Sequence, residues 1–98
     1  MVSAVVLLVV DKSKVNEVAE RLVELPAISE VYSVAGQYDL VAVARVKDNE
    51  GIADAVTNQM LKIEGILRSE TLIAFRAYSR YSLDRMFSIG NEEPPPGD

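Results

Sequence analysis

Residues that could bind a ligand gather in one short stretch of this 98-residue chain. Gly36 is followed closely by Tyr38, Asp39 and Leu40. Gly36 would let a ligand approach the backbone, Tyr38 could pack against it, and the Asp39 carboxylate could bind a cationic amine. The alternative interpretation is that Gly36 and Asp39 are only turn residues.

A second polar stretch follows Gly65, where Ser69 and Thr71 flank Glu70. The two hydroxyl groups could each donate a hydrogen bond to a small ligand or accept one from it. The alternative is an ordinary polar strand that faces solvent. The two stretches are far apart along the chain, so a shared site would need a fold that brings them together.

The residue types on which most enzymes and metal sites depend are missing. The sequence has no histidine, cysteine or tryptophan. Histidine is the commonest general base and metal ligand near neutral pH, and a chain without cysteine has neither thiol catalysis nor disulfides. A glycine-rich phosphate loop and a calcium-binding loop are absent too. We therefore expect a binding module, not an enzyme, without catalytic residues, metal or cofactor.

The charge balance argues against direct contact with nucleic acid. Of the net charge of −5, three units belong to Glu92, Glu93 and Asp98, which leaves −2 for residues 1–90. DNA repels such a surface on average, even though basic and aromatic residues alternate late in the chain. The apolar run Ala4–Val10 follows no basic residue and is far shorter than the ~20 residues that cross a bilayer. We expect a cytoplasmic protein with no membrane segment.

The spacing of apolar residues predicts the framework that must position these candidates. Four segments have the composition of strands: Val2–Val10, Ile28–Ala35, Leu40–Val46 and Ile66–Tyr78. Helical spacing of apolar residues after Ser13 and after Asp48 predicts two helices between them. The order βαββαβ predicts an α+β, ferredoxin-like sandwich, in which both helices cover one face of a four-stranded antiparallel sheet. We expect residues 1–90 to form one domain with a C-terminal docking segment, and residues 91–98 to be a disordered tail.

The first and third strands are apolar on both faces, although the two helices can cover only one. The surplus face would carry Val5, Leu7, Val9, Val41 and Val43, or their alternates. Exposed together, these residues would form a larger apolar patch than monomers usually tolerate. Sheet-on-sheet packing with a second copy would cover them, so we expect at least a homodimer.

Several motifs resemble those of a known family. They are L-P-A-I-S-E-V at Leu25–Val31, S-V-A-G-Q-Y-D-L at Ser33–Leu40, I-E-G-I at Ile63–Ile66 and S-E-T at Ser69–Thr71. In this order they resemble the effector-binding (RAM) domain of the Lrp/AsnC, or feast/famine, transcriptional regulators, over about residues 2–78. Full-length members carry an N-terminal helix-turn-helix domain, whereas here the first strand follows Met1 directly. The resemblance therefore implies a stand-alone effector domain that does not itself bind promoters.

The resemblance also implies a site and an assembly. Family domains form dimers through their sheets and assemble further, commonly as tetramers of dimers, with amino-acid effectors bound between dimers. Carried over to this sequence, the ligand-binding residues are Gly36, Tyr38, Asp39, Leu40, Gly65, Ser69 and Thr71. The implied function is amino-acid sensing by a homo-oligomer that co-assembles with full-length Lrp/AsnC regulators.

Two other functions compete with this one. Small dimeric α+β-barrel enzymes share the topology, but that analogy rests on fold alone. ACT-type regulatory domains share the element order and bind amino acids as well. They usually place a glycine-containing ligand loop after the first strand, where this chain has Asp11-Lys12-Ser13-Lys14.

Overall fold

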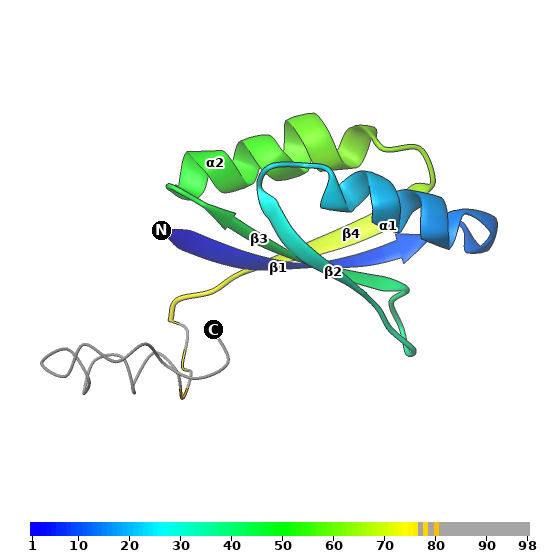
Figure 1. The fold of residues 1–98 in the computed structure, drawn as a ribbon, viewed down its shortest axis with the longest axis horizontal. Helices are drawn as coiled ribbons and strands as arrows, with labels where there is room; N and C mark the ends of the chain where they lie inside the picture. Colours follow the sequence, from blue (N-terminus) through cyan, green and yellow to red (C-terminus); the bar gives the residue numbers. More distant parts are fainter. Residues whose placement is uncertain (77, 79, 81–98) are drawn as a thin grey trace, which may run out of the picture.

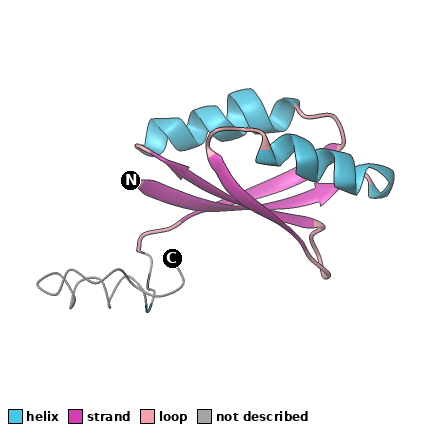
Figure 2. Cartoon of the chain, in the orientation of Figure 1, coloured by secondary structure: helices cyan, strands magenta, loops and turns pink. Residues whose placement is uncertain are grey.

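The computed structural model describes residues 1–76, 78 and 80, and within them confirms the predicted order of elements. The strands are β1 (Val2–Val10), β2 (Ile28–Ser33), β3 (Leu40–Val46) and β4 (Ile66–Ile73). A 3-10 turn (Lys12–Lys14) leads into α1 (Val15–Val23), and α2 (Asn49–Ala53) continues through a π-helical stretch (Asp54–Gln59) into a 3-10 turn (Met60–Lys62). The sheet order is β2-β3-β1-β4, with every neighbouring pair antiparallel. Both helices lie on one face of the sheet, as Figures 1 and 2 show.

Polar side chains cap the starts of the helical segments. The Asp11 carboxylate accepts a hydrogen bond from the backbone N–H of Ser13 at 2.9 Å, and Asp48 accepts one from the N–H of Gly51 at 2.9 Å. Each bond helps to satisfy a backbone N–H of the first turn, where the donors lack the usual partner four residues earlier within the helix.

The predicted fourth strand is too long. Its alternation continues to Tyr78, but β4 ends at Ile73, which pairs with Ala4. One further hydrogen bond joins the Ala74 N–H to the Ser3 carbonyl at 2.9 Å, and β1 itself begins at Val2. The register leaves only Val2 and Met1 beyond this point, so β4 ends within two residues of the start of β1. The predicted docking segment, which follows Tyr78, and the tail lie outside the described residues, apart from Arg80.

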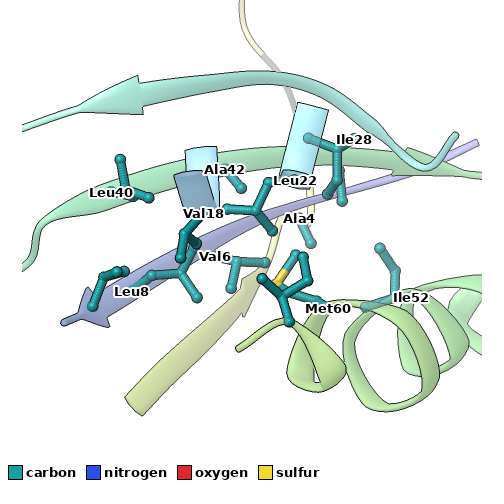
Figure 3. Packing of buried hydrophobic residues seen from close by; sticks show 13 residues of the cluster. Ala4, Val6, Leu8, Val18, Leu22, Ile28, Leu40, Ala42, Ile52 and Met60 are labelled. Carbon is teal, nitrogen blue, oxygen red and sulfur yellow. The ribbon is translucent and has the colours of Figure 1, made fainter. Parts of the chain in front are cut away.

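The core lies between the sheet and the helices. Figure 3 shows Val6 and Leu8 of β1 packed among Leu22 of α1, Leu40 of β3 and Met60 after α2, and all five side chains are fully buried. Val23, at the end of α1, is 53% exposed, whereas its neighbour Leu22 is fully buried. Within the described residues, no helix is long and apolar enough to cross a membrane.

Among the described residues, no helix lies over the opposite face of the sheet (Figure 1). Pairing places Val5 beside Val43 and Leu7 beside Val41, with Val9 farther along β1. All five side chains are partly exposed, whereas their sequence neighbours under the helices are buried. The sequence left open whether these residues or their alternates form the surplus face, and the structure places these five on it. We call this surface, made of Val5, Leu7, Val9, Val41 and Val43, the open face.

Candidate functional site

Both predicted polar stretches come to the same end of the sheet. In an antiparallel sheet, the end of β1 lies beside the starts of β3 and β4. The loop between β2 and β3 projects beyond this end, as Figure 1 shows, and carries Gly36, Tyr38 and Asp39. Gly65 lies just before β4, where its carbonyl accepts a 2.8 Å hydrogen bond from the Asp11 N–H.

Asp39 fastens the projecting loop to the end of β1. Its Oδ2 accepts a hydrogen bond from the Val10 N–H at 2.9 Å, and its Oδ1 forms an ion pair with Lys12. Its own N–H donates to the Leu8 carbonyl at 2.8 Å, and its carbonyl accepts from the Val34 N–H at 3.0 Å. The side chain is only 14% exposed. Both carboxylate oxygens therefore already have donors within the protein.

Those contacts favour the charged form of Asp39. The Lys12 ammonium, and after it the Val10 N–H, hold the pKa of the Asp39 carboxyl below its usual value, against the partial loss of hydration. A charged carboxylate at neutral pH is therefore part of the structure of this end of the sheet.

Tyr38 reaches a residue to which the sequence prediction gave no role. Its hydroxyl donates a 2.6 Å hydrogen bond to Oε1 of Glu70, in β4. This bond, with lost hydration and the negative charge of Glu70, raises the pKa of Tyr38, while the positive charge of Arg68 acts in the opposite direction. The phenol is therefore a neutral donor at physiological pH.

Ser69 and Thr71 lie at this end of the sheet but on its other side. Ser69 pairs with Leu8 and Thr71 pairs with Val6, both of which are buried beneath the helices. Glu70 pairs with Leu7, on the open face. Because neighbouring residues of a strand point to opposite faces, the predicted site is divided between the two sides of the sheet. Leu40 is 0% exposed and belongs to the core.

The two glycines have different surroundings. Gly65 has φ +109°, and a Cβ there would lie 2.9 Å from Cγ2 of Val18. Gly36 has φ +136° and would have no atom within 4 Å of an added Cβ. Both need the conformational freedom of glycine, but only Gly36 leaves space beside the backbone for another molecule.

Lys12 and Glu70 are the members of this site that the sequence prediction missed. Both residues are distant in sequence from the Gly36–Leu40 stretch, so the sequence alone does not show that they contact it. Their proximity follows from the register of β1 with its two neighbouring strands, which places Leu8 between Leu40 of β3 and Ser69 of β4. Alternation along β4 then turns Glu70 toward the side opposite Ser69.

A separate hollow of about 300 Å³ lies along the outer side of α1. It is lined by Lys14, Glu17, Glu20, Arg21, Glu24, Ile63 and Glu64. Lys14 Nζ pairs with Glu64 Oε2 at 3.0 Å, and this contact raises the pKa of Lys14. The described residues contain no group of three or more side chains placed to hold a metal ion. The acidic side of α1 fits the solvated helix face expected from the sequence.

The fold and the paired strand ends define a ferredoxin-like α+β domain, and comparison with known proteins places it in a family. Residues 3–83 match the family model of the Lrp/AsnC ligand binding domain. The chain therefore belongs to the Lrp/AsnC ligand-binding domain family, which confirms the resemblance and decides against the ACT-type alternative.

Individual relatives agree with this assignment. The HTH-type transcriptional regulator FL11 of Pyrococcus furiosus is 35% identical over 75 residues, which are 76% of this chain and 49% of FL11. The chain thus spans about half the length of the curated relatives it matches. The crystal structure of TTHA0845 from Thermus thermophilus superposes with a TM-score of 0.77 at 50% identity, over 82% of this chain and 100% of that one.

A more distant structure has the same fold with a ligand present. The feast or famine regulatory protein Rv3291c from M. tuberculosis, complexed with L-methionine, superposes with a TM-score of 0.68. The match covers 82% of this chain and 54% of that one, at 24% identity.

Proposed function

We propose that this chain is an amino-acid-sensing module that regulates transcription through assembly. The ligand site lies at the end of the sheet where the loop Val34–Asp39 meets the start of β4. It draws on Gly36, Tyr38 and Asp39 of the loop and on Gly65 before β4, whereas the predicted residues Ser69 and Thr71 lie on the helix side of the sheet and Leu40 lies in the core. The carrying observation is that two polar stretches about 30 residues apart are joined there by the 2.6 Å bond between Tyr38 and Glu70.

The ligand class rests on charge and on family. Hydroxyl donors, carboxylates and an exposed arginine are the groups that the ammonium and carboxylate of a free amino acid require. The complex of Rv3291c with L-methionine supports this class, since that protein shares the fold. The named relatives are transcriptional regulators, which favours regulation over catalysis.

The open face is the proposed contact between two copies. It presents five partly exposed aliphatic side chains in one continuous patch across β1 and β3. At about 1.5–3 kcal/mol for each fully buried aliphatic side chain, covering this patch is a strong driving force for association. A two-fold axis makes the patch complementary to itself, so a homodimer is the smallest assembly.

Regulation then follows from linkage. Dimers assemble further, to tetramers of dimers, and a ligand bound between dimers shifts that equilibrium by its difference in affinity for the assembled and separate states. The same surfaces would admit full-length regulators of the family, so the module acts through co-assembly with DNA-binding relatives. The net charge of −2 over residues 1–90 disfavours direct contact with DNA.

A thermal-shift screen tests this function. The protein is melted with each of the twenty amino acids at millimolar concentration, with the D-enantiomers as matched controls. A ligand at about 100 times its Kd stabilises the folded state by about 2.7 kcal/mol, which is readily visible as a rise in Tm. A stereoselective rise for one or a few L-amino acids supports sensing. No rise with any of them would refute amino-acid sensing, and light scattering that gives a monomeric mass would refute assembly.

A further inference from the structure

The two carboxylates beside the projecting loop differ in how they are engaged. Asp39 has protein donors on both oxygens and a side chain that is 14% exposed. Glu70 is exposed, and its Oε1 accepts the Tyr38 hydroxyl. Within the described part of the chain, Oε2 of Glu70 has no hydrogen-bond partner. A ligand could reach Glu70 without breaking a contact that holds the fold, whereas Asp39 would first have to release Lys12 or Val10.

A cation stands on the same side of the same strand. Arg68 pairs with Val9 and Glu70 pairs with Leu7, so both side chains lie on the same side of the sheet as the open face. Two residues along a strand correspond to about 6.6 Å. Arg68 is exposed, and its charge acts on the Tyr38 phenol, as the opposing influence on that pKa shows. Anion, cation and phenol therefore lie together at the edge of the sheet.

This arrangement is complementary to the main-chain end of an amino acid. Resting on the function proposed above, we infer that Glu70 with Tyr38 binds the ligand's ammonium, that Arg68 binds its carboxylate, and that Asp39 is a positioning residue that holds Tyr38 in place. A guanidinium can bind a carboxylate through two parallel hydrogen bonds, which fixes the ligand's orientation.

The location explains why recognition would depend on assembly. An exposed ion pair contributes little by itself, because water and salt screen it. Glu70 and Arg68 border the open face, where packing of a second copy would exclude water. Their contacts with a ligand would strengthen once the dimer has formed, so ligand binding would be linked to dimer formation as well as to the assembly of dimers proposed above.

The test compares Glu70→Gln and Arg68→Gln with Asp39→Asn in calorimetric titrations. Glu64→Gln, which changes an exposed carboxylate on the far side of α1, is the matched control. The probes are the L-amino acid that gives the largest shift with the wild type, its N-acetyl form, which has no ammonium, and its amide, which has no carboxylate.

We expect Glu70→Gln to weaken binding of the free amino acid at least tenfold and to remove the preference for it over the N-acetyl form. Arg68→Gln should remove the preference over the amide. Asp39→Asn should lower the Tm without ligand but retain both preferences, because a positioning residue contacts neither the ammonium nor the carboxylate of the ligand. Glu64→Gln should bind as the wild type does.

Other outcomes distinguish failure of this inference from failure of the proposed sensing function. If the wild type binds an amino acid and Asp39→Asn alone abolishes the preference for the ammonium, the inference is overturned and the proposed function stands. If Glu70→Gln changes the mass measured by light scattering but leaves the ligand preference unchanged, Glu70 is an interface residue and the inference is again overturned. If the wild type binds none of the twenty amino acids, the inference falls together with the sensing function.

Discussion

The two faces of β1 carry nearly the same residues in different surroundings. Val6, Leu8 and Val10 are at most 1% exposed beneath the helices, whereas Val5, Leu7 and Val9 are partly exposed on the open face. Both sets are aliphatic, and residues of the same size alternate along one strand. The helices therefore account for only half of the apolar surface that β1 provides, and the other half is available for a partner.

The difference between the faces separates folding from assembly. Residues beneath the helices contact one another across β1, β3, α1 and Met60, so their burial is complete within one chain. Those on the open face are only partly buried by the described residues, and a second copy would complete their burial. Substitutions on the two faces should consequently act on two different equilibria, the folding of the chain and the association of copies.

The largest effect should come from Leu8→Ala compared with Leu7→Ala. Leu8 is 0% exposed, so removing its side chain leaves a cavity and should lower the free energy of unfolding by about 2–5 kcal/mol. Leu7→Ala removes the same atoms from a partly exposed site and should cost the folded chain much less. Urea denaturation of both variants at one fixed protein concentration gives the comparison.

Assembly must be separated from folding in that experiment, since dimer formation stabilises the folded state by mass action. Repeating the denaturation at tenfold lower concentration should reduce the wild-type stability and leave the difference for Leu8→Ala nearly constant. Equal losses for the two leucines at both concentrations would show that the faces are not distinct.

Association should be most sensitive to a charge on the open face. In Val43→Asp, each of the two copies would lose at least about 1.5 kcal/mol of apolar burial, or about 3 kcal/mol for the dimer. The dimer Kd should therefore rise about a hundredfold. Val23→Asp makes the same change at a residue of α1 that is 53% exposed, and should leave the Kd unchanged. Sedimentation at several concentrations measures both, and a Val43→Asp variant that still dimerises like the wild type would exclude the open face as the contact.

The sequence predicted this contrast between faces well because its cause is local. The aliphatic runs of β1 and β3 stop at Asp11 and Lys47, so the bounds of those strands are as predicted. The end of β4 could not be predicted in this way, because the alternation continues beyond Ile73 although its partner β1 begins only two residues before Ala4. Strand ends set by pairing depend on residues about 70 positions away.

The candidate site shows the same limit. The Gly36–Leu40 stretch and the Ser69–Thr71 stretch could each be proposed from residue type and from the family resemblance. The sequence did not reveal that Glu70 faces Tyr38 or that Lys12 pairs with Asp39, since both contacts depend on the register of β1 with its neighbours. Residue type indicated where chemistry is possible, and register decided which groups can act together.

The two glycines at this end of the sheet should respond differently to alanine. Gly65→Ala forces a positive φ on a residue with a Cβ, at a cost of about 1–3 kcal/mol, and sets that Cβ 2.9 Å from Val18 in the core. Gly36→Ala imposes the same backbone strain, but its Cβ would meet no neighbouring atom, so it should destabilise the protein less than Gly65→Ala does. Differential scanning calorimetry of both variants tests the difference. If Gly36→Ala were the more destabilising, the open space beside the loop would not exist in solution.

The smallest expected effect is the dependence of stability on pH. It tests whether Asp39 is a structural link between the projecting loop and β1. The contacts with Lys12 and Val10 lower the pKa of Asp39 in the folded state, so folding favours its charged form. The stabilisation is therefore complete above the unfolded pKa of about 3.9 and is lost as the pH falls from there through the folded pKa. Asp39→Asn should be less stable than the wild type at pH 7, and this difference in the free energy of unfolding should decrease below about pH 4. Urea midpoints of both proteins across this range measure the difference, and Asp11→Asn controls for the other aspartate whose pKa is lowered. A difference that stays constant into acid would mean that the Asp39 carboxylate does not hold the loop through its charge.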